Sequence, residues 1–175
     1  MPKDSILCSG CDDRVDMEQA RPGTYVLVPW SRSTDLVQIG RLGALQLRSG
    51  SYVYVGSALG SGGVRARLDH HLELSRRPHW HIDYLRAHTR VEDILYRLDT
   101  QCLEHVWAER IGLTDGASVP LVGFGSTDCG CESHLLFSFF QQRTSRDGFW
   151  RQLQASSHNI PVLSAFGLAA LDTLG

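Results

Sequence analysis

Residues 52–81 constrain the fold more than any other stretch, because a strand, a glycine-rich turn and a basic helix follow one another there. The strand is predicted at 51–57, where Tyr and Val dominate as a pleated, half-buried surface prefers. Alternation places the tyrosines and Gly56 on one face and the valines on the other. We expect the valines to face a core, and the bare backbone at Gly56 to allow a close approach on the tyrosine face.

The glycines after this strand predict a turn that starts a helix, with Ser61 as its candidate cap. Apolar residues recur at every fourth position from Val64 and define the buried stripe of that helix. Arg67 and His71 are also four residues apart, so they should lie side by side next to the stripe. An Arg and a His that face a Tyr at a strand end suit anion binding and proton transfer.

The remaining periodicity predicts an α+β fold with a small antiparallel central sheet flanked by helices. We expect the early strands to form an antiparallel meander that leads into the strand at 51–57. The other predicted strands lie at 23–28, 36–39, 44–48, 91–98 and 135–140, and two further helices are predicted at 80–88 and 101–111.

Composition is that of an ordinary soluble globular chain, with 42% hydrophobic and 21% charged residues. The 175 residues suffice for one domain with a real core. We expect a poorly ordered leader at 1–22, the domain at 23–140 and a C-terminal tail at 141–175. Neither a run of about 18 apolar residues nor a signal-peptide pattern occurs, so we expect a cytoplasmic protein without a membrane span.

Charge is unevenly distributed along the chain. The formal net charge of -2 gives no overall attraction to nucleic acid. Residues 57–90, however, hold six arginines and five of the eight histidines against three acidic residues. This locally basic segment could bind an anionic partner, or it could be a solvated helix face.

Five cysteines, an odd number in no disulfide-scaffold spacing, indicate reduced thiols. Cys129, Cys131 and His134 could ligate zinc, with a fourth ligand from the Cys8 and Cys11 pair near the N-terminus. A turn in which small thiols pack is the alternative, and a reactive Cys129 is a third possibility. We favour the packed turn, because the spacing of the two later cysteines is short and a fourth ligand from the leader would be loosely held.

Gly23-Thr24-Tyr25 is followed along the chain by Tyr54-Val55-Gly56, and then by Arg67 and His71 on the next predicted helix. The order of these three motifs resembles that of the GIY-YIG nuclease superfamily, with GTY in place of its first motif and YVG in place of its second. The chain most resembles a branch of small, uncharacterised bacterial and archaeal proteins of this superfamily. That resemblance covers about residues 23–138, including the blocks at 79–85, 123–129 and 133–135.

The resemblance implies a three-stranded antiparallel sheet flanked by helices and hydrolysis of DNA phosphodiester bonds with one divalent metal, Mg²⁺ or Mn²⁺. It gives Tyr25 the role of base or relay at the attacking water and Arg67 a contact with the phosphate. Glu104 is the implied metal ligand, with Glu109 as the alternative. The other implied site residues are Tyr54, His71 and His79 in catalysis, and Gly56, Ser57, Arg65 and His81 in substrate binding.

Two points of the resemblance stay open. The Asn that often follows the metal-binding Glu in the superfamily has no clear counterpart, and Ser126 or Asp128 could take its place. A tyrosine acts as a base only if a nearby cation or metal-bound water lowers its pKa from about 10.

The main hypothesis from the sequence is a metal-dependent DNA endonuclease. The alternatives are a catalytically weak nucleic-acid-binding module on the same scaffold, or a zinc or thiol protein centred on 129–134.

Overall fold

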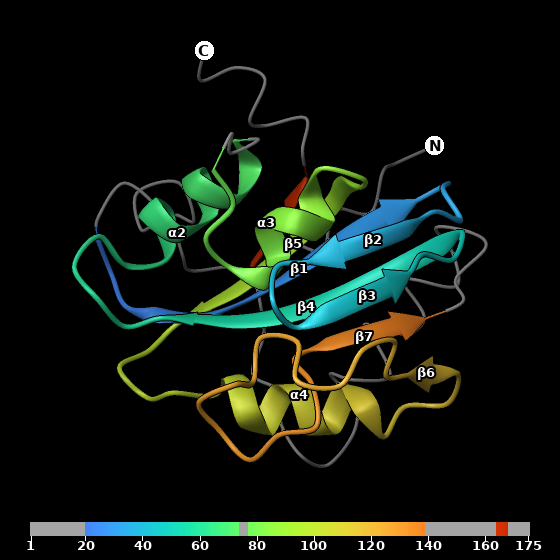
Figure 1. Cartoon of the computed structure of the whole chain (residues 1–175). Helices are drawn as coiled ribbons and strands as arrows, with labels where there is room; N and C mark the ends of the chain where they lie inside the picture. The colour runs from blue at the N-terminus through green and yellow to red at the C-terminus, as the bar shows by residue number, and fades with distance from the viewer. Residues whose placement is uncertain (1–19, 74–76, 139–163, 168–175) are drawn as a thin grey trace, which may run out of the picture.

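The computed structural model describes residues 20–73, 77–138 and 164–167 (Figure 1). Its centre is the antiparallel pair of β1 (Gly23–Ser31) and β4 (Gly50–Ala58). β5 (Arg90–Leu98) lies antiparallel on the other side of β1. The expected α+β class is confirmed.

Within the described residues the main sheet has six strands in the order β6-β7-β4-β1-β5-β8. It is therefore wider than the three strands that the resemblance implied. The added strands are β6 (Ala117–Ser118) and β7 (Leu135–Ser138) beside β4, and β8 (Ser164–Gly167) beside β5. β8 falls in the segment predicted as a tail, whereas residues 1–19 of the predicted leader lie outside the described residues.

The predicted meander is wrong. β2 (Leu36–Ile39) and β3 (Gly43–Gln46) pair with each other in a separate two-stranded sheet, and β1 pairs directly with β4. The physical reason is burial. β1 and β4 bury almost every residue on both faces, as central strands do, whereas β2 buries only alternate residues. A strand that is apolar on one face fits a peripheral hairpin.

Helices cover both faces of the main sheet, as Figure 1 shows. α2 (Gly63–Leu72) and α3 (His81–Arg86) pack on the tyrosine face of β4, and α4 (Glu104–Gly112) packs on the valine face. The valines of β4 therefore face a core as expected. The tyrosine face is buried as well, in a second core, so this side of the sheet can hold a site that is shielded from water.

The start of α2 depends on glycines and not on Ser61. Gly62 is the N-cap, with a left-handed φ of 96° and no capping side chain. Gly63 also has a positive φ of 58°, and a β-carbon there would lie 2.5 Å from the carbonyl carbon of Arg21. The predicted cap at Ser61 is therefore wrong. The chain instead needs a backbone turn that only glycine adopts easily.

A transmembrane helix would need a long, apolar segment, and none of the helices in the described ranges meets that requirement.

Candidate active site

Tyr25 and Gly56 lie opposite each other at the centre of the sheet, on β1 and β4. A β-carbon at Gly56 would lie 2.6 Å from Cζ of Tyr25 and closer still to its hydroxyl oxygen. Only a glycine therefore lets the Tyr25 ring cross β4 in this position. Tyr54 stands beside it, with the two ring centroids 6.4 Å apart. The Tyr and the Gly of the two sequence motifs are thus parts of one packing arrangement.

His71, in the last turn of α2, contacts Tyr25 directly. The Tyr25 hydroxyl lies 2.8 Å from His71 Nε2, although the two residues are 46 positions apart in the chain. Both side chains are buried, with about 1% of each residue exposed. The His71 ring also packs edge-on against Tyr54. The chain therefore places a histidine nitrogen against a tyrosine hydroxyl in a site shielded from solvent.

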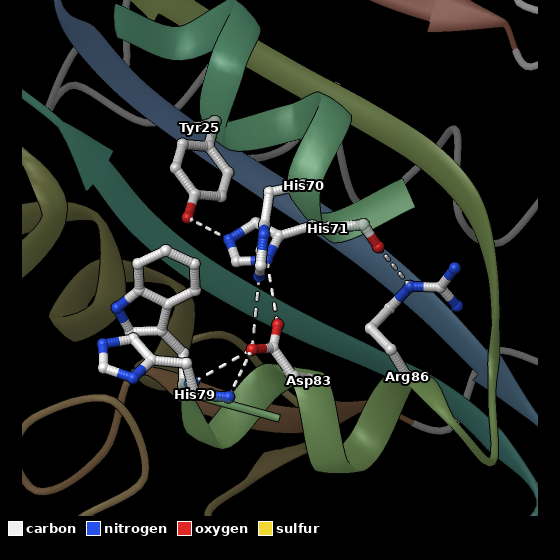
Figure 2. Close-up of polar contacts among 7 residues, drawn as sticks. Tyr25, His70, His71, His79, Asp83 and Arg86 are labelled. Atoms are coloured by element: carbon white, nitrogen blue, oxygen red, sulfur yellow. Dashed lines mark hydrogen bonds and ion pairs between the residues drawn. The ribbon is translucent and has the colours of Figure 1, made fainter. Parts of the chain in front are cut away.

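Asp83, near the start of α3, supports His71 from the opposite side (Figure 2). Its Oδ1 lies 3.4 Å from His71 Nδ1. Its Oδ2 accepts hydrogen bonds from the backbone N–H groups of His79 at 2.9 Å and Trp80 at 3.0 Å, and lies 3.3 Å from His70 Nε2. The three side chains Asp83, His71 and Tyr25 form one chain of polar contacts, which we call the Asp–His–Tyr chain.

The charge states along this chain follow from its surroundings. Burial acts to raise the pKa of Asp83, but the close contact with His71 and the hydrogen bonds from two backbone N–H groups outweigh it and hold the pKa far below its usual value. Burial lowers the pKa of His71, against the opposite effect of Asp83. Burial, with Tyr54 next, raises the pKa of Tyr25 well above its usual value. At neutral pH Asp83 is therefore ionised, whereas His71 and Tyr25 are neutral.

These charge states fix the direction of the hydrogen bonds. An ionised carboxylate can only accept, so His71 carries its proton on Nδ1, which faces Asp83. Nε2 of His71 then has a free lone pair and accepts the hydrogen bond that the Tyr25 hydroxyl donates. Such an arrangement can accept a proton from Tyr25, in the way that an Asp–His pair accepts a proton from a serine in hydrolases.

Arg67 and Glu104 bring opposite charges to the two tyrosines. The charge of Arg67 lowers the pKa of both tyrosines and the charge of Glu104 raises it, although burial is the larger effect on each. Arg67 lies over the Trp80 ring, with its Cζ 4.2 Å from the ring centroid. Glu104 begins α4, and 19% of its side chain is exposed. One cation and one carboxylate therefore act on the same pair of phenols.

The other predicted site residues are less closely grouped. Arg65 pairs with Asp69 on the exposed side of α2, 2.9 Å apart. His81 accepts the backbone N–H of Gly125 through Nδ1 at 3.0 Å. The His79 side chain is exposed, and it is the backbone of this residue that holds Asp83. Ser57 lies half-buried on β4, next to Gly56.

Sequence reasoning missed Asp83, which orients the site. A usable signal was present, because an acidic residue three positions after the start of a helix often binds the free N–H groups there. It missed Arg86 as well, which is buried and donates from Nε to the backbone carbonyl of His71 at 2.9 Å. The contacts that Asp83 and Arg86 make with His71 have no sequence pattern, because each joins two different helices.

Three groups of described side chains could hold a metal ion. One of them, Cys102, Glu104 and His105, contains the predicted ligand Glu104, and two others do not. His70, His71 and Asp83 form one, but their polar atoms already bind one another. The other consists of Cys129, Cys131 and His134 with His105 of α4. Cys8 and Cys11, which the sequence offers as candidates for a fourth ligand, lie outside the described residues.

The two candidates for the missing Asn differ in exposure. Ser126 is buried, and its hydroxyl has no partner among the described residues. Asp128 is exposed.

Fold and site together define an α+β protein with a buried Asp–His–Tyr chain between a central sheet and two helices. A family model described as "Domain of unknown function DUF123" matches residues 24–155, which is most of the chain. The protein belongs to this family, whose description assigns no activity. Searches of curated proteins and of solved structures return no significant match.

Proposed function

We propose that this protein is a metal-dependent DNA endonuclease that hydrolyses phosphodiester bonds at a site of GIY-YIG type. The observation that carries the proposal is the hydrogen bond from Tyr25 to His71, backed by ionised Asp83. The motif order gave Tyr25 and His71 separate roles. The geometry supports a joint role, because the two side chains meet at hydrogen-bond distance.

A buried tyrosine is a poor base, because its raised pKa keeps the hydroxyl protonated. The Asp–His–Tyr chain gives that proton a group to which it can move. Tyr25 can pass its proton to Nε2 of His71 while its oxygen takes a proton from the attacking water. The carboxylate of Asp83 stabilises the imidazolium that forms. The positive charge of Arg67, which lowers the pKa of Tyr25, acts in the same direction. The proton can thus leave the reaction centre through groups that are already in contact.

Arg67 suits the role of phosphate ligand. Its guanidinium group presents a planar fork that matches the oxygens of a phosphate, and the Trp80 ring holds it in place. No carboxylate in the described ranges forms an ion pair with Arg67. Its charge is therefore available to a phosphodiester.

Glu104 fits the role of metal ligand. Its carboxylate is partly buried, acts electrostatically on both tyrosines, and has only His105, 3.8 Å away, as an ion-pair partner within the described part of the chain. A single carboxylate with waters is a usual site for Mg²⁺ or Mn²⁺. When bound, such an ion would neutralise charge that develops on the phosphate. Glu109, the alternative ligand, is exposed further along α4, which favours Glu104.

The test is nicking of supercoiled plasmid and of a branched oligonucleotide with Mg²⁺ or Mn²⁺. Tyr25→Phe should lower the rate by about 100-fold or more, the usual contribution of a positioned proton-transfer group. Glu104→Gln should abolish metal-dependent cutting, because it removes the carboxylate that would hold the ion. Tyr84→Phe and Glu109→Gln are the matched controls and should cut like wild type. Binding of the same oligonucleotide is measured by fluorescence anisotropy and should survive in all four variants.

Two results would contradict the proposal. Nicking that persists in both site variants would mean a contaminant or a different site. DNA binding by the wild type without cutting under any metal condition would favour the nucleic-acid-binding module instead.

A further inference from the structure

A second group of reactive side chains lies where the loop before β7 meets α4. Cys129 and Cys131 belong to this loop, His134 directly precedes β7, and His105 is the second residue of α4. One ligand atom from each of the four residues lies within 4.8 Å of every other. The loop and the helix lie on the same side of the main sheet in Figure 1. Two segments that are distant in sequence thus converge on one point.

Two sulfur–nitrogen distances within this group match those between the ligands of a tetrahedral zinc ion, and the remaining distances are at most 4.8 Å. The Cys129 Sγ atom lies 3.4 Å from His134 Nε2, and the Cys131 Sγ atom lies 3.5 Å from His105 Nδ1. Zinc–sulfur bonds of about 2.3 Å and zinc–nitrogen bonds of about 2.0 Å at a tetrahedral angle give a sulfur–nitrogen distance of about 3.5 Å. Two thiols and two imidazoles are also a donor set that zinc prefers over harder cations.

The surroundings favour a bound ion. His134 is buried and the other three residues are partly buried, so a site here is shielded but reachable. The ring nitrogen of His105 that points away from Cys131 lies 3.8 Å from Glu104 Oε1. At 3.8 Å this carboxylate is too far away for a hydrogen bond, but its charge favours a proton on the nitrogen that faces it, which leaves Nδ1 to the metal.

We propose that Cys129, Cys131, His134 and His105 form a structural zinc site. Four protein ligands leave no open position for a substrate, so the site serves the fold and not a reaction. It ties the loop to the first turn of α4, the turn that carries Glu104. The ion would therefore hold this turn in place relative to the sheet.

This inference does not rest on the proposed nuclease activity, since its test measures metal content without any substrate. The full chain, with any histidine tag removed, is purified without added metal and analysed by inductively coupled plasma mass spectrometry. One zinc per chain is expected for wild type, and near zero for Cys131→Ser and for His105→Gln. Zinc-free wild type whose Cys129 and Cys131 are joined in a disulfide would overturn the assignment.

Other thiols serve as matched controls. Cys102→Ser removes an exposed thiol two residues before Glu104, and a Cys8→Ser/Cys11→Ser variant removes the pair near the N-terminus. Both variants should keep one zinc per chain. Loss of zinc from either would refute the four-residue assignment.

A second measurement covers the case in which the ligand variants do not fold. Wild type depleted of metal is titrated with Co²⁺, which reports geometry through its absorption. Strong visible bands of tetrahedral cobalt together with a near-ultraviolet thiolate-to-cobalt band are expected, saturating at one ion per chain. Weak visible bands typical of six-coordinate cobalt, or no thiolate band, would contradict the proposal.

Discussion

Replacing Asp83 by Asn tests whether one buried carboxylate organises the site. The change keeps the shape of the side chain but removes its charge. Asp83 is 3% exposed at its side chain, accepts two backbone N–H groups and faces two histidines. Asn also offers one oxygen and one NH₂ group in place of two acceptor oxygens, so the variant cannot reproduce all of these contacts.

The expected loss can be worked out contact by contact. A hydrogen bond to a charged group contributes about 1.5–3 kcal/mol and a neutral one about 0.5–1.5 kcal/mol, so each backbone contact loses roughly 1 kcal/mol. The longer histidine contacts together add about 1 kcal/mol. We expect the free energy of unfolding to fall by about 3 kcal/mol. In a chain of this size that corresponds to a decrease in Tm of roughly 6–12 °C.

The assay is urea unfolding at pH 7, followed by circular dichroism, with Asp69→Asn as the control. Asp69 is an exposed carboxylate that pairs with Arg65 on α2, so its replacement should change stability by less than about 1 kcal/mol. A loss in Asp83→Asn no larger than that in the control would refute the reasoning. Nicking activity per folded molecule should fall as well, because a neutral amide no longer stabilises the imidazolium of His71.

The effect should also depend on pH with a defined sign. The pKa of Asp83 is lower in the folded protein than in the unfolded chain. Its stabilisation is therefore fully present above about pH 5 and is lost as the pH falls below about 4 toward the folded value. The measurement compares the free energy of unfolding with and without the Asp83→Asn change from pH 7 to pH 3. Both proteins also carry His71→Gln, because protonation of the buried imidazole would add its own pH dependence. The difference between them should narrow at low pH, and a constant difference would contradict the assignment.

Two further substitutions test the packing around the same site. Gly56→Ala should destabilise the protein by about 3 kcal/mol in the same urea assay, the upper end for overpacking, because its β-carbon would overlap the Tyr25 ring. Gly60→Ala, where a β-carbon meets nothing within 4 Å, should be neutral, and equal effects of the two changes would contradict this explanation. Arg86→Met should lower the melting temperature, since it leaves the buried carbonyl of His71 without its donor at a cost of about 1–3 kcal/mol. Finding Arg86→Met as stable as wild type would show that this bond does not matter.

Local pattern was enough to find the parts of the fold that depend on neighbouring residues. The period-two alternation around Gly56 predicts β4, and the four-residue spacing of Arg67 and His71 predicts their common side of α2. The strand and the helix face are encoded within a few residues of where they appear. The grouping of Tyr25 with His71, by contrast, came from the family resemblance, because the two residues are 46 positions apart.

Pairing across the chain was decided only by the tertiary structure. The meander was predicted because consecutive strands usually pair, yet β1 bypasses the β2–β3 hairpin and joins β4. The choice depends on which strands can be buried on both faces at once, and that is a property of the whole core.

In both the Asp–His–Tyr chain and the cysteine–histidine group, the sequence showed some of the residues and the tertiary structure added the rest. The sequence by itself identified Tyr25 and His71 as candidate site residues, and the closely spaced Cys129 and Cys131 as a candidate metal-binding or packed turn. The tertiary structure decided that Asp83 of α3 supports His71, and that His105 of α4 joins the group around Cys131. Contacts between separate helices and loops leave no periodic signal, because they exist only once the sheet has brought those elements together.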